Sequence, residues 1–155
     1  MSPFVRYQKT VWSFVLTVAA LGAWPAAAAA QGVGVRAGAS VKPDQFYVGG
    51  HYETRPIVEG LHFRPNLEVG FGDDRTVVGA NIEFVYKVPI EGPWSLYAGG
   101  GPALNIYSVN DDTATDGGLN VLFGAETTQG LFFEVKIGVI DSPDLKFGVG
   151  YTWRR

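Results

Sequence analysis

The 155-residue sequence contains no cysteine. Disulfide bonds, thiolate metal sites and a cysteine nucleophile are therefore excluded. It also lacks a basic patch, which argues against nucleic acid binding. After residue 30, no segment reaches the roughly 20 consecutive apolar residues that a transmembrane helix needs. If this part of the chain lies in a membrane, it must cross it as a closed β-barrel.

The first 30 residues have the three parts of a secretory signal peptide. Arg6 and Lys9 give a basic start, an uncharged apolar stretch follows, and Ala28 and Ala30 are the small residues that a signal peptidase requires. We expect cleavage after Ala30, which leaves residues 31–155 as one domain. The alternative is an uncleaved membrane anchor, because residues 11–30 have about the length of a membrane span.

The composition favours β-structure with tight turns, since the chain has 21 Gly, 10 Phe, 7 Tyr and 4 Trp. Eight segments alternate between apolar and polar residues, and turn residues separate them. Each segment is close to the length that a tilted strand needs to cross a bilayer. The predicted strands are 33–41, 46–53, 61–71, 76–88, 94–109, 118–127, 131–140 and 145–153.

The alternation divides the side chains into two faces. One face is almost free of charge, as in the last predicted strand, where Phe147, Val149 and Trp153 share it. The other face carries five basic and five acidic residues together with Asn, His and many glycines. The ten charged residues are Arg36, Glu53, Arg64, Glu68, Glu83, Lys87, Glu126, Glu134, Lys136 and Lys146. Such a balance suits an enclosed interior, because a buried charge without a partner is very costly.

The sequence therefore predicts an all-β fold: an eight-stranded, antiparallel, up-and-down transmembrane β-barrel with a polar, charge-paired interior. A soluble, lipocalin-like barrel with an apolar ligand inside would show the same alternation. The balanced charges, the short loops and the placement of Trp94 and Trp153 at one end favour the membrane barrel. Eight strands enclose a space that side chains can fill, so we expect no open pore.

The segment KFGVGYTW resembles the C-terminal β-signal of bacterial outer-membrane proteins, through Lys146, Gly148, Tyr151 and Trp153. Arg154 and Arg155 follow it, where that signal usually ends on an aromatic residue. The segments FYVGGHYE and WSLYAGGGPALNIY also resemble strands of the small OmpA/OmpX-like outer-membrane barrels. The resemblance implies location in the bacterial outer membrane, contact with its lipid and recognition by the barrel-assembly machinery. We expect a monomer with both termini in the periplasm.

All eight aspartates fall in segments predicted as outer loops. They are Asp44, Asp73, Asp74, Asp111, Asp112, Asp116, Asp141 and Asp144. Clustered carboxylates could bind divalent cations. Asp also favours turns through hydrogen bonds to the backbone, which is the simpler explanation. We therefore expect neither a metal site nor a cofactor.

A catalytic site needs a nucleophile, a base and an orienting group within hydrogen-bond reach. His51, His62, Ser40 and Ser108 are the candidates, and no motif brings them together. We therefore predict a non-catalytic outer-membrane barrel with a structural or surface-contact role. A lipid A-modifying enzyme and a soluble barrel that binds a small apolar ligand are the alternatives.

Overall fold

The computed structural model describes residues 31–42, 44–72, 75–140 and 143–154. The predicted signal peptide lies outside these residues. The chain forms eight strands. They are β1 (Gly32–Val41), β2 (Gln45–Glu53), β3 (Leu61–Gly72), β4 (Arg75–Pro89), β5 (Trp94–Val109), β6 (Asp112–Thr127), β7 (Leu131–Ile140) and β8 (Leu145–Arg154).

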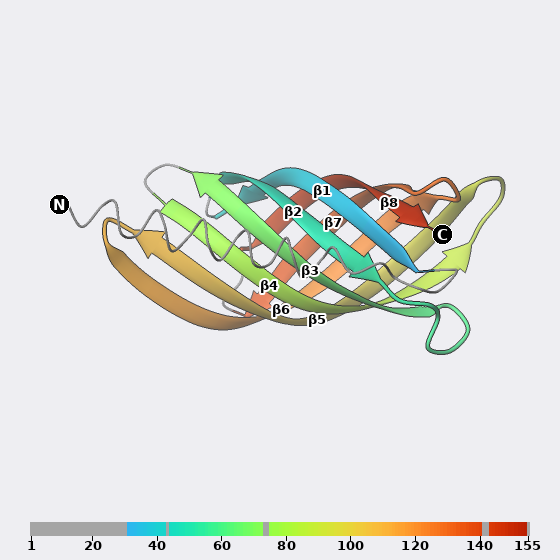
Figure 1. The fold of residues 1–155 in the computed structure, drawn as a ribbon, viewed down its shortest axis with the longest axis horizontal. Coiled ribbons are helices and arrows are strands. Elements are labelled where there is room, and N and C mark those ends of the chain that lie inside the picture. Colours follow the sequence, from blue (N-terminus) through green and yellow to red (C-terminus); the bar gives the residue numbers. More distant parts are fainter. Residues whose placement is uncertain (1–30, 43, 73–74, 141–142, 155) are drawn as a thin grey trace.

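Each strand pairs antiparallel with its neighbours in sequence, and β1 pairs with β8 to close the barrel (Figure 1). Closure leaves the wall without the unpaired strand edge that lipid would not tolerate. Among the described residues, there is no helix that is long and apolar enough to cross a membrane. The predicted fold is therefore confirmed, and most strand limits agree with the predicted ones to within a residue or two.

The exception is β6, which begins six residues earlier than predicted, at Asp112 rather than at residue 118. The reason is a two-residue turn in which Asn110 and Asp111 have φ values of 43° and 71°. Asn and Asp tolerate this left-handed conformation, which matches the twist of a hairpin. Asp112 and Asp116 are therefore strand residues, and their assignment to an outer loop was wrong.

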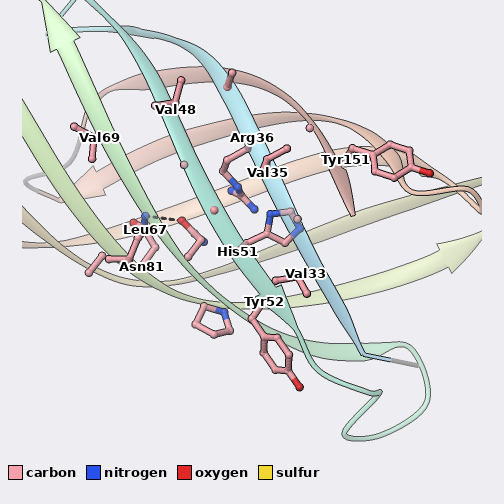
Figure 2. A pocket seen from close by; sticks show the side chains of 18 of the residues that line it. Val33, Val35, Arg36, Val48, His51, Tyr52, Leu67, Val69, Asn81 and Tyr151 are labelled. Carbon is pink, nitrogen blue, oxygen red and sulfur yellow. Dashed lines mark hydrogen bonds between the residues drawn. The ribbon is translucent and has the colours of Figure 1, made fainter. Parts of the chain in front are cut away.

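The apolar face of the sheet lies outside and the charged face inside. Phe147 and Val149 are 50% and 43% exposed, whereas Arg36, Glu68 and Lys136 are at most 3% exposed. In Figure 2, Val33, Val35 and Tyr52 project from the same strands that carry Arg36 and His51. The hollow drawn there is lined largely by outward apolar residues such as Val48 and Leu67. This orientation excludes the soluble, lipocalin-like alternative.

The two ends of the barrel differ. We call the end with Gly32 and Arg154 the terminal end, and the opposite end, with the β5–β6 turn, the hairpin end. Trp94 begins β5 and Trp153 lies next to the end of β8, so both tryptophans belong to the terminal end, as predicted. At the hairpin end, the β5–β6 pair continues to Asp112, although β7 pairs with β6 only as far as Leu119.

The lumen is less polar than the sequence suggested. Val85, Tyr97, Leu122 and Phe132 form a buried apolar cluster inside the barrel. Glycines make room for the rings: a Cβ atom on Gly150 would lie 2.3 Å from the Phe132 ring, and one on Gly124 would lie 2.2 Å from the Tyr97 ring. These two glycines therefore accommodate the aromatic side chains of the lumen.

Candidate functional site in the barrel lumen

The charged lumen is the candidate functional site. Its charged side chains come from seven strands, all except β5, and they occupy inward positions of the alternation. The structure brings all ten predicted charged residues into ion pairs, in two groups. We call them the central cluster (Arg36, Arg64, Glu68, Glu83, Glu134, Lys136 and Lys146) and the terminal cluster (Glu53, Lys87, Glu126 and Arg154).

Glu134 on β7 is the common acceptor of the central cluster. Arg36 donates to it from β1 at 3.1 Å, and Arg64 donates from β3 to its other oxygen. The Tyr97 hydroxyl donates to that second oxygen at 2.9 Å. The Arg64 guanidinium also stacks 4.8 Å from the centre of the Tyr97 ring. One carboxylate therefore ties together β1, β3, β5 and β7, which are not neighbours in the wall.

Two lysines complete the central cluster. Lys136 on β7 forms ion pairs with Glu83 on β4 and with Glu68 on β3, the latter at 3.2 Å. Lys146 on β8 donates to the other oxygen of Glu68. Glu68 is only 2% exposed, and it also pairs with Arg36 at 3.4 Å. Because charge-assisted hydrogen bonds are the strong ones, these contacts hold opposite walls of the barrel together.

The terminal cluster lies in the lumen at the terminal end of the barrel. Lys87 on β4 lies 2.7 Å from both Glu53 and Glu126. Arg154 on β8 donates to Glu126 at 2.7 Å and to Glu53 at 3.4 Å. The ten residues predicted from the sequence do not include Arg154, which follows the segment that resembles the β-signal. Its position, an even number of residues after the inward Lys146, was the signal that could have identified it.

The apolar cluster separates the two groups of charges. On β4, the inward residue Val85 stands between Glu83 of the central cluster and Lys87 of the terminal cluster. On β7, Phe132 lies on the terminal side of Glu134. The lumen is thus layered along its axis as charges, apolar side chains and charges. The polar side chains His51 and Thr152 lie beside Phe132 at the same level of the lumen.

Neutral polar side chains also cross the lumen. Asn120 donates to Asn81 at 3.0 Å, and Asn81 donates to Asn66 at 2.8 Å, so three amides link β6, β4 and β3. The second of these hydrogen bonds is drawn in Figure 2. Such a chain satisfies buried amides that would otherwise destabilise the fold.

The catalytic candidates lie apart from one another. His51 is 4% exposed and lies 2.9 Å from the Thr152 hydroxyl, with its ring edge-on to Phe132. His62 lies on β3, with Nδ1 3.0 Å from the carbonyl of Thr54. Ser40 pairs with Gln45, whereas His51 pairs with Gly34, so six residues, roughly 20 Å of strand, separate Ser40 from the His51 position. Ser108 is at the hairpin end of β5.

Within the part of the chain that the structure describes, no three His, Asp or Glu side chains form a group that could hold a metal ion. Asp73, Asp74 and Asp141 lie outside the described residues. Divalent cation binding by the clustered aspartates therefore stays an untested alternative.

The predicted assembly signal lies on β8. Lys146 points inward, Gly148 shares its face, and Tyr151 and Trp153 lie on the outer face with their rings 5.3 Å apart. This placement has the inward and outward alternation of the signal that the segment resembles. Its role in assembly stays a prediction.

No protein-family model and no curated protein matches this sequence. Three solved structures are similar in fold. The N-terminal β-barrel domain of Pseudomonas aeruginosa OprF has a TM-score of 0.59 and 12% identity, over 80% of this chain and 97% of that one. Neisserial surface protein A (NspA) has a TM-score of 0.57 and 17% identity, over 81% and 95%. The outer membrane enzyme PagL has a TM-score of 0.54 and 12% identity, over 80% and 99%.

At these identities the comparison shows the fold alone. It agrees with the eight antiparallel strands, the closed wall and the apolar outer surface described above. Together they support the predicted localisation in the bacterial outer membrane. The chain has the eight-stranded β-barrel fold of small bacterial outer-membrane proteins.

Proposed function

We propose that this chain is a non-catalytic integral outer-membrane protein whose closed lumen gives it a structural or surface-contact role. The observation that carries the proposal is the cross-linking of the lumen, in which Glu134 alone binds groups from three other strands. We expect a lumen tied together in this way to leave no continuous channel for solutes. The apolar layer around Phe132 and Val85 adds a barrier to ions.

A planar bilayer measurement tests the closed lumen. Purified protein folded into a bilayer should leave the conductance at the level of the bare membrane. Stable conductance steps in the wild-type protein would contradict the proposal. Heat-dependent mobility on a denaturing gel, together with recovery in the membrane fraction, shows that the sample is folded and inserted.

The enzymatic alternative rests on the shared fold with the outer membrane enzyme PagL. Against it, His51 is enclosed in the lumen and contacts Thr152. Ser40 lies on β1, six residues from the position that pairs with His51. Mass spectrometry of lipid A from cells with and without the gene separates the two proposals. We expect identical acyl chains in both, and a change in acyl-chain number on deletion would establish the enzyme.

We further propose that the barrel-assembly machinery recognises β8 through Lys146, Gly148, Tyr151 and Trp153. What supports this is the alternating placement of these residues on the closing strand, which pairs with β1. Replacing Tyr151 and Trp153 together by Ala should reduce the amount of folded protein in the outer membrane of cells. The purified variant should still fold in detergent, because the lumen contacts are unchanged.

A further inference from the structure

The loop between β2 and β3, residues 54–60, differs from the other turns at the terminal end. It is longer than the β6–β7 turn of residues 128–130, and its tip is apolar. Ile57 and Val58 are 56% and 60% exposed, among the highest values for large apolar side chains in the described chain. Exposing two such adjacent side chains to water is unfavourable, which indicates that this tip lies in an apolar environment.

The loop is held in a defined conformation by backbone hydrogen bonds. Ile57 donates to the carbonyl of Leu61 at 2.7 Å, and Leu61 donates to that of Val58 at 2.9 Å. At its base, Thr54 accepts a hydrogen bond from the Phe63 amide through its hydroxyl, at 3.1 Å. The exposure of Ile57 and Val58 is therefore a property of a fixed backbone.

The loop is also joined to the outer, apolar surface of the barrel. The amide of Lys87 donates to the carbonyl of Gly60 at 2.8 Å. A Cβ atom on Gly60 would lie 2.9 Å from the Tyr86 ring, which is itself 52% exposed on the outer face. Val88 and Ile90 follow Tyr86 on that face and are 49% and 46% exposed. The apolar tip of the loop thus continues the apolar outer surface of the barrel wall.

In Figure 1 the loop projects from the side of the barrel near the end that carries the C terminus, away from the long axis. A loop that continued along the axis would reach water, whereas one that projects sideways at this level meets the edge of the bilayer. Pro56, Ile57 and Val58 form the uncharged centre, and Arg55 and Glu59 flank them. Apolar residues between polar ones suit the boundary of acyl chains and head groups.

We propose that the 54–60 loop inserts Ile57 and Val58 into the lipid leaflet at the terminal end, at the boundary between acyl chains and head groups. The loop thereby anchors this end of the barrel against movement along the membrane normal. The inference rests on the proposed membrane location of the barrel and adds a lipid-binding site outside its wall. A protein partner for the same surface is the alternative that the test separates.

Because the sequence has no cysteine, single-cysteine variants can carry one fluorescent label each. The test compares Ile57→Cys and Val58→Cys, labelled with a nitrobenzoxadiazole dye, in phosphatidylcholine vesicles. Phe84→Cys, on the outer wall, is the reference for lipid contact, and Gln129→Cys, in the exposed turn at the same end, is the reference for water. Lipids with a spin label near the head group and iodide on both sides of the membrane serve as quenchers.

We expect the labels at residues 57 and 58 to be quenched by the shallow spin-labelled lipid at least twofold more than the label at residue 129, and less by iodide. Equal iodide quenching at residues 57, 58 and 129, with the label at residue 84 still in lipid, would overturn the lipid anchor and leave a protein partner as the explanation. Loss of lipid quenching at residue 84 would instead contradict the membrane location itself.

A variant without a label provides a second measurement. Replacing Ile57 and Val58 together by Ser should lower the urea midpoint for unfolding in vesicles relative to Gln129→Ser. An unchanged midpoint, within the error of the matched control, would also overturn the anchor. The loop lies outside the lumen, so both variants should keep the heat-dependent gel mobility of the folded barrel.

Discussion

The guanidinium of Arg154 lies 2.7 Å from the carboxylate of Glu126, although β7 stands between their strands in the wall. The same guanidinium reaches Glu53 on β2, beyond the β1–β8 seam that closes the barrel. The residue next to the C-terminal one therefore bridges both sides of the last strand. A position that seemed in the sequence to follow the assembly signal is a structural part of the terminal cluster.

Arg154→Ala should lower the free energy of unfolding by about 1–2 kcal/mol, because charge-assisted bonds are lost at a partly exposed site. The side chain is 28% exposed, so water recovers part of the loss. Urea unfolding in vesicles measures the change. Arg154→Lys is the matched control, and it should lose less stability than Arg154→Ala because it keeps the positive charge. An equal loss in both variants would contradict the contribution of that charge.

Glu134→Gln should lower the free energy of unfolding by about 3–5 kcal/mol, more than Arg154→Ala, because it leaves two buried guanidiniums with weaker partners. After the change, Arg36 keeps Glu68 at 3.4 Å and Arg64 keeps Glu83 at 3.8 Å. Urea unfolding in vesicles again gives the value. Glu91→Gln, in the exposed β4–β5 turn, should change stability by no more than about 0.5 kcal/mol.

Phe132→Ala and Phe133→Ala compare the two faces of one strand. Phe132 is 1% exposed inside the barrel, and Phe133 is 49% exposed on its outer wall. We expect a loss of about 3–5 kcal/mol for Phe132→Ala, because it leaves a cavity beneath two guanidiniums. Lipid can fill the space left by Phe133→Ala, so its loss should be clearly smaller. A larger loss at residue 133 would indicate that the faces are reversed.

The same Phe132→Ala variant tests the barrier to ions. Removal of the ring opens the apolar layer between the two charge clusters, so brief conductance events should appear in a planar bilayer. The wild-type protein and Phe133→Ala should show none. The absence of conductance in all three proteins would mean that the Phe132 ring is not needed to close the lumen.

A charged residue placed on the outer wall should lower the free energy of unfolding by an amount that depends on its depth in the membrane. Leu67→Arg, in the middle of β3, should lower stability by about 2–4 kcal/mol if it lies near the bilayer centre. Val88→Arg, near the terminal end of β4, should cost only about 0–1 kcal/mol, as near an interface. Both side chains are exposed on the same face, at 36% and 49%. Equal losses would indicate that no bilayer surrounds this wall.

The sequence predicted the strands well where alternation was regular, as in β5 and β7, whose limits are the same as the predicted ranges. It failed at β6, because composition suggested a long loop where Asn110 and Asp111 form a two-residue turn. Exposed strand residues in a hairpin that extends beyond the barrel wall need no apolar face, so alternation gave no signal there.

Local alternation fixes which residues share a face, because side chains in a strand point alternately to its two sides. The same alternation separates the ten charged residues from the apolar ones. Which charges meet depends on the closed barrel, since partners such as Arg36 and Glu134 lie 98 residues apart in the sequence and become neighbours when the wall closes. The division of the charges into two clusters, with Phe132 and Val85 between them, likewise follows from the stagger of the strands, which no local pattern records.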